Sequence, residues 1–139
     1  MENKMPAPLW VDDGAGVRLM AGRHVPSARI VFPLPEEGGA APRYERILLS
    51  PRGILWSWTV QRFRPKTPPY TAFDRGEFRP FVLGYVEFPE GIIVEGRIDA
   101  PADGHALRIG QTMNTLIVPI ATDELGGAIQ IHGFGAAQS

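Results

Sequence analysis

The clearest pattern in the chain is an alternation of apolar and polar positions with a period of two. It is strongest over residues 54–63, where Ser57, Thr59 and Gln61 form the polar face. Such alternation is typical of a β-strand with one buried face. Residues 81–88 and 92–98 also read as strands, and Pro89-Glu90-Gly91 between them predicts a tight turn. The predicted inward positions of these three strands are Ile54, Trp56, Trp58, Val60, Val82, Val86, Ile92, Val94 and Ile98.

The pattern changes after residue 101 and then returns to strands. Residues 105–109 predict about one helical turn, which Gly110 ends. Residues 113–120 and 128–134 predict two further strands, joined by a hairpin loop over residues 123–127. Three strands, a short helix and two strands follow one another in the order of the five-stranded OB-fold barrel. We therefore predict an all-β OB-fold, with a five- or six-stranded barrel of another topology as the alternative.

The remaining segments suggest a domain organisation. Residues 1–16 are rich in small residues and turn formers and predict a flexible arm, anchored by Leu9 and Trp10. Residues 17–43 hold short apolar pieces interrupted by prolines, which excludes a long helix. The barrel is predicted over residues 44–134 and a fraying tail over residues 135–139.

The composition of the chain excludes several kinds of binding site and ligand. The chain has 139 residues, 16 glycines, 14 prolines, no cysteine and a net charge of −1. The near-neutral charge gives no general attraction for nucleic acid or for an acidic membrane. The lack of cysteine excludes disulfides, thiol nucleophiles and Cys-ligated metals. No apolar run is long enough for a signal peptide or a membrane span, so a soluble cytoplasmic protein is expected.

Candidate catalytic groups are few. The three histidines, His24, His105 and His132, are far apart and have no metal ligand at the usual spacing. Glu87 and Glu95 lie mid-strand and could face one another as an acid/base pair, or lie on the solvent face beside Arg97. A small enzyme that uses His132 with one of these glutamates is therefore one hypothesis for the function. Catalysis by this chain alone is nevertheless not expected.

One cluster alternates cations with aromatics at the end of the first strand and in the Pro-rich segment after it. Its members are Arg62, Phe63, Arg64, Lys66, Tyr70, Arg75, Phe78 and Arg79. Such residues serve as anchors in protein docking, bind an anionic ligand such as a coenzyme A tail, or stack on single-stranded nucleic acid. The pattern leaves all three open, and docking is favoured.

The order of motifs resembles the zinc-ribbon/OB-fold family known as domain of unknown function 35. Five motifs in sequence carry the resemblance over residues 17–134. They are Leu19-x-x-Gly22-x-His24-x-x-Ser27-Ala28 with Phe32-Pro33; Ser50-Pro51-Arg52-Gly53 leading into Leu55-Trp56-Ser57-Trp58-Thr59-Val60; Gly84-Tyr85-Val86-Glu87-Phe88; Glu95-Gly96-Arg97-Ile98; and Leu107-Arg108-Ile109-Gly110.

The main departure from this family lies in the ribbon. The first cysteine pair of the family falls at His24 and Ser27, and the second falls near residues 36–43, which contain no cysteine or histidine. A structural zinc site needs four N or S ligands. We therefore expect a degenerate, rubredoxin-like ribbon hairpin without zinc and without any other cofactor. It would be held by the apolar side chains of Ile30, Phe32 and Leu34, or by a partner's surface.

The resemblance implies a non-catalytic accessory subunit of a thiolase-like acyl-CoA enzyme: a thiolase, a retro-aldolase or an acyltransferase. The implied partner is a thiolase-fold subunit in a heterotetramer of two plus two, with an acyl-CoA thioester as the partner's substrate. A nucleic-acid-binding OB-fold module is the alternative. The candidates for contact with the partner or with coenzyme A are Trp10, Phe32, Arg62, Phe63, Arg64, Lys66, Tyr70, Phe78 and Arg79.

Overall fold

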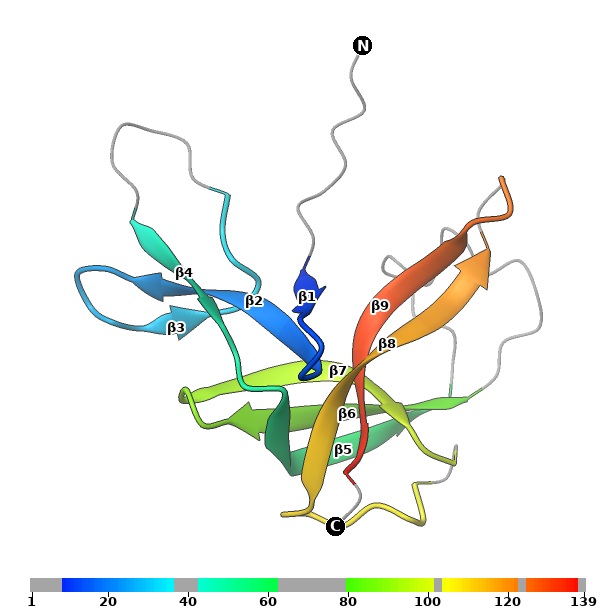
Figure 1. The fold of residues 1–139 in the computed structure, drawn as a ribbon. Coiled ribbons are helices and arrows are strands. Elements are labelled where there is room, and N and C mark those ends of the chain that lie inside the picture. Colours follow the sequence, from blue (N-terminus) through cyan, green and yellow to red (C-terminus); the bar gives the residue numbers. More distant parts are fainter. Residues whose placement is uncertain (1–8, 37–42, 63–79, 102–103, 123–124, 138–139) are drawn as a thin grey trace.

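The computed structural model describes residues 9–36, 43–62, 80–101, 104–122 and 125–137. Its strands fall into two groups (Figure 1). The N-terminal group contains β1 (Trp10–Asp12), β2 (Val17–His24), β3 (Ile30–Val31) and β4 (Tyr44–Leu48). The second group contains β5 (Arg52–Gln61), β6 (Phe81–Phe88), β7 (Ile92–Asp99), β8 (Thr112–Thr122) and β9 (Ala128–Ala136).

The N-terminal group is a small antiparallel sheet built around β2. Gly22 of β2 is opposite Val31 of β3 and also opposite Arg46 of β4. The first half of β2 pairs with β1, which lies within residues 1–16. The Leu34 side chain covers Gly22 so closely that a Cβ there would lie 3.0 Å from it. The hairpin of β2 and β3 is thus closed by backbone pairing and apolar cover.

The second group closes into a barrel in the order β5-β6-β7-β9-β8. Four of the pairings are antiparallel, and the fifth, between β7 and β9, is parallel and brings Arg97 opposite Gly133. The predicted five-stranded OB-fold barrel is confirmed. The β8–β9 pairing continues to Thr122 and Ala128, so this hairpin projects beyond the barrel (Figure 1).

One hydrophobic core joins the two groups. Leu19, Ala21 and Leu49 belong to the same buried cluster as the barrel residues. The predicted inward positions Val82, Val86, Val94 and Ile98 are buried, and Trp58, Val60 and Ile92 pack against the cluster. The cluster also contains Leu55, Phe88, Met113 and Phe134. The N-terminal sheet is therefore packed on the barrel and does not stand apart from it.

The predicted inward face of β5 is wrong over its first half. Ile54 is 43% exposed and Trp56 is 56% exposed, whereas Leu55 is fully buried. The cause is a β-bulge between Leu55 and Ser57, which leaves Trp56 without a cross-strand partner on β6. An extra residue in one strand reverses the alternation beyond it. Trp58 therefore points inward as predicted, while Trp56 points to solvent.

The predicted short helix between the third and fourth barrel strands is not seen among the described residues. Turns occupy this segment, with bonds from Leu107 N–H to the Gly104 carbonyl (3.0 Å) and from Gln111 N–H to the Arg108 carbonyl (3.2 Å). Gly104 and Gly110 both have positive φ, at 70° and 92°. These two glycines lie at either end of residues 105–109 and take a backbone conformation that does not continue a helix. The five residues between them are too few to offset the free-energy cost of starting a helix.

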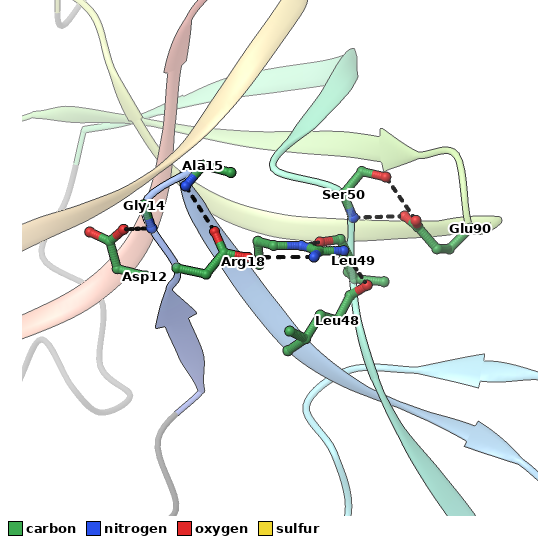
Figure 2. A network of polar contacts seen from close by, with 9 residues as sticks. Asp12, Gly14, Ala15, Arg18, Leu48, Leu49, Ser50 and Glu90 are labelled. Atoms are coloured by element: carbon green, nitrogen blue, oxygen red, sulfur yellow. Dashed lines mark hydrogen bonds and ion pairs between the residues drawn. The ribbon is translucent and has the colours of Figure 1, made fainter.

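A polar network holds the segment that crosses from β4 to β5 (Figure 2). The Arg18 guanidinium of β2 donates from Nε to the Leu49 carbonyl (2.9 Å) and from Nη2 to the Leu48 carbonyl (3.2 Å). The Glu90 carboxylate accepts from Ser50 N–H (3.1 Å) and from Ser50 Oγ (2.8 Å). Glu90 lies in the β6–β7 turn, so this residue and Arg18 attach the crossing segment to the barrel and to the sheet.

Candidate functional site

The turn between β2 and β3 is closed by hydrogen bonds. Nδ1 of His24 lies 2.7 Å from the Ser27 hydroxyl oxygen. The N–H of Ala28 donates to the His24 carbonyl (2.6 Å), and His24 N–H donates to the Arg29 carbonyl (2.7 Å). Ala28 has a φ of 61°, in the left-handed region that favours glycine. His24 and Ser27 are thus linked directly, at the positions of the family's first cysteine pair.

The residues of the ribbon do not fit a zinc ion. A serine hydroxyl is not among the usual ligands of structural zinc, and the His24 nitrogen is already used by Ser27. Over the described part of the chain, no three His, Cys, Asp or Glu side chains come together as a metal site. The family's second cysteine pair would fall near residues 36–43, whose sequence contains no Cys or His. These donors are too few for the four-ligand site of a zinc ribbon.

Two of the predicted contact residues pack on the protein's own core. Trp10 of β1 and Phe32, just after β3, are half-buried and lie against the core cluster. Arg62 is exposed at the end of β5. The other candidates lie outside the described residues, namely Phe63, Arg64, Lys66, Tyr70, Phe78 and Arg79. Among the described candidates, Trp10 and Phe32 thus belong to the packing of the N-terminal sheet, and Arg62 to the end of β5.

Phe32 meets the barrel at His132 of β9. The two rings are in edge contact with centroids 5.3 Å apart, and the centroid of the Phe134 ring lies 6.1 Å from that of His132. Nε2 of His132 is 2.8 Å from the backbone carbonyl oxygen of Glu95 on β7 and must donate to it. Nδ1 is then unprotonated, is enclosed, and has no hydrogen-bond partner among the described residues.

This environment makes His132 sensitive to pH. Burial lowers the pKa of His132 below its usual range, although the Glu95 carbonyl and the Glu95 charge act in the opposite direction. The unfolded chain binds this proton with a pKa of about 6.5, and the folded chain binds it only at lower pH. The contribution of His132 to stability is therefore complete above about pH 6.5 and is lost as the pH falls below that value.

We predict that His132→Gln makes the free energy of unfolding less dependent on pH between about pH 7.5 and about pH 5.5. Glutamine keeps an N–H donor for the Glu95 carbonyl but does not titrate. Urea unfolding of both proteins across this range measures the effect. Gln130→Ala, which changes an exposed side chain that does not titrate and lies on the same strand, is the matched control and should leave the shape of the profile as it is. Parallel profiles for the wild type and His132→Gln would contradict the assignment.

Of the two alternatives for Glu87 and Glu95, the structure favours the solvent face, because the two residues are exposed and are not opposite each other. Glu87 is opposite Ile93, and Glu95 is opposite Tyr85. The Tyr85 hydroxyl is hydrogen-bonded to the Glu95 carboxylate, and the charge of this carboxylate raises the pKa of Tyr85. His132 contacts the backbone of Glu95 through Nε2. The geometry therefore does not support an acid/base pair of Glu87 with Glu95 assisted by His132.

The aromatic platform expected for a nucleic-acid module is also incomplete. A nucleic-acid module would need Phe81 and Tyr85, which share one side of β6, as exposed rings, but Phe81 is only 6% exposed. The Arg97 guanidinium lies over the Phe81 ring, 4.3 Å from its centroid. A base needs an open ring face for stacking, and Phe81 does not offer one.

Three large apolar side chains on β5 and β7 are exposed to solvent. Ile54, Trp56 and Ile93 are 43%, 56% and 40% exposed on β5 and β7. Sequence reasoning missed the first two because the period-two pattern assigned them to the core. The bulge that exposes Trp56 depends on the register with β6, and the sequence of β5 alone carries no signal for it.

No helix in the described part of the chain is both long enough and apolar enough to cross a membrane.

The fold and its two parts define a class: a small ribbon-type sheet packed on an OB-fold barrel, as in the domain of unknown function 35 proteins. The chain belongs to this family, because the model of the C-terminal OB-fold domain of ChsH2 matches residues 47–116. A search of curated proteins finds no match to the chain.

A solved structure supports the same fold over most of the chain. It is described as the "Ltp2-ChsH2(DUF35) aldolase" and superposes with a TM-score of 0.56 at 20% sequence identity. The match covers 86% of this chain and 84% of the other. It therefore includes the N-terminal sheet as well as the barrel.

Proposed function

We propose that this chain is a non-catalytic accessory subunit of a thiolase-like acyl-CoA enzyme. The observation that carries the proposal is the family match of the barrel, joined to the likeness of the whole chain to a chain of the Ltp2-ChsH2(DUF35) aldolase. In this proposal a thiolase-fold partner supplies the nucleophile and the bases. The complex is a heterotetramer of two plus two, and an acyl-CoA thioester is the substrate held by the partner.

The geometry of the chain agrees with an accessory role. His132 donates to a backbone carbonyl and contacts the Phe32 and Phe134 rings. The Glu95 carboxylate lies beside Tyr85, and its charge raises the pKa of that tyrosine. These groups serve to position strands and to join the N-terminal sheet to the barrel. The proposed place of contact with the acyl-CoA is the exposed end of β5 at Arg62.

Co-expression tests the proposal. The probe is the thiolase-type protein whose gene adjoins that of this chain, or else each thiolase-type protein of the same genome. We expect the tagged chain to purify with one of them, and light scattering after gel filtration to give the mass of a two-plus-two complex. Acyl-CoA turnover by the partner should depend on this chain. A chain that stays alone with every such protein at micromolar concentration would refute the proposal.

A further inference from the structure

The outer face of β5, β6 and β7 carries two cross-strand rows. In the first row Ile54 is opposite Glu87, and Glu87 is opposite Ile93. In the second row Ser57 is opposite Tyr85, and Tyr85 is opposite Glu95. We call this surface the outer face, and define it by Ile54, Trp56, Tyr85, Glu87, Ile93 and Glu95.

The bulge sends the largest side chain of this face into solvent. Trp56 is the extra residue between the Leu55–Val86 and Ser57–Tyr85 pairs. Without it, Ser57 would follow Leu55 in regular alternation and the strand would still bury Leu55 and Trp58. Bulges commonly re-aim a side chain beside a functional surface. Tryptophan is enriched among the residues that dominate the free energy of protein association.

The charges of the outer face indicate which kind of surface can bind to it. Glu87 and Glu95 are both exposed. The ion pairs formed within the described ranges, Arg18 with Asp13 and Arg23 with Glu45, are both in the N-terminal part of the chain. Glu95 is opposite Tyr85, and the charge of its carboxylate raises the pKa of Tyr85. Arg97, which follows Glu95 on the same side of β7, lies over the Phe81 ring, and Arg52 of β5 donates to Asn114 Oδ1. The two exposed carboxylates repel phosphates, so nucleic acid is disfavoured and a basic protein surface is favoured.

We propose that the outer face is where the partner subunit docks, through an apolar hollow that takes Trp56 and Arg or Lys side chains that pair with Glu87 and Glu95. This rests on the proposed function and adds the face and the chemistry of the partner's surface. Ile54 and Ile93 flank Glu87 and exclude water from the contact, as the near-neutral rim of an interface does. Trp10 and Phe32 lie on the core and serve the fold of the free chain.

The test measures binding of the purified full chain to the thiolase-type protein identified by co-expression. Trp56→Ala should raise the Kd by about thirtyfold or more, as expected for a central tryptophan. Glu87→Lys should raise it by about tenfold, and added salt should weaken the wild-type complex. Because both side chains are exposed, thermal unfolding of the variants should match that of the wild type.

Val25→Ala is the matched control, since Val25 is an exposed apolar residue (60%) in the turn after β2, away from the outer face. Its Kd should equal that of the wild type. If the wild type binds and both Trp56→Ala and Glu87→Lys bind within about twofold of it, the outer face is not the docking surface, while the proposed function stands. Binding of a single-stranded oligonucleotide that Trp56→Ala abolishes would also overturn this inference. Failure of the wild type itself to bind refutes the proposed function.

Discussion

Replacing Gly133 by alanine should prevent the barrel from closing. Gly133 is opposite Arg97 where β9 pairs in parallel with β7. An added Cβ would lie 2.5 Å from the Arg97 carbonyl oxygen and 2.7 Å from a Val118 methyl group. The carbonyl belongs to the backbone of β7, so the clash is relieved only by moving the two strands apart. We expect a loss of about 3 kcal/mol or more in the free energy of unfolding.

Urea unfolding followed by circular dichroism measures this loss. Gly126→Ala is the control, because Gly126 has open space around it and a φ of 83°. It should lose only about 1 kcal/mol, from the strain of alanine in the left-handed region. An unfolding midpoint of Gly133→Ala equal to that of the wild type would show that β7 and β9 do not pair at this register.

Replacing Phe134 by alanine should lower the free energy of unfolding by about 3–5 kcal/mol. Phe134 is fully buried, and its ring lies 5.9 Å from the Phe88 ring. It also fills the space above Gly96, where a Cβ would lie 2.5 Å from it. Truncation removes its burial and leaves a cavity that β-strand backbones on either side cannot collapse to fill.

Trp56→Ala provides the matched comparison, since it also truncates an aromatic side chain, but one that is mostly exposed. We expect a loss of less than about 1 kcal/mol for it. The pair of variants thus separates the core face from the outer face of the barrel. Equal losses for Phe134→Ala and Trp56→Ala would contradict the assignment of these faces.

The hairpin of β2 and β3 is held by hydrogen bonds and by apolar packing. The turn between β2 and β3 is closed by the His24–Ser27 contact and by backbone hydrogen bonds. Its apolar side chains, Ile30 and Phe32, pack on the shared core as the sequence predicted, and Leu34 covers Gly22. Burial on the barrel and pairing with β4 stabilise the folded form of this hairpin. In a ribbon that binds zinc, metal coordination supplies that stabilisation.

The strand pattern of the barrel could be predicted because each strand's burial leaves a period-two signal. The faces of β6 and β7 follow from that signal alone, and Val82, Val86, Val94 and Ile98 are buried as expected. The face of β5 does not, because Ile54, Leu55 and Trp56 are all apolar and either alternation buries a large side chain. The bulge opposite β6 decides between them.

The candidate sites were harder to predict than the strands. Trp10 and Phe32 stand out in the sequence as large apolar residues near the start of the chain. Their position against the core depends on how the N-terminal sheet packs on the barrel. The contact of Phe32 with His132 joins residues that are far apart in sequence, and neither residue's neighbours indicate it.

The sequence by itself determined the number and order of the barrel strands, the turns between most of them, and the lack of a zinc ligand set. These properties depend on local alternation, on glycine and proline, and on the residue types present. The tertiary structure alone decided that Trp56 faces solvent, that β7 and β9 close the barrel at Gly133, and that His132 is enclosed by Phe32 and Phe134. Each of these depends on the register between strands distant in sequence, which local patterns do not encode.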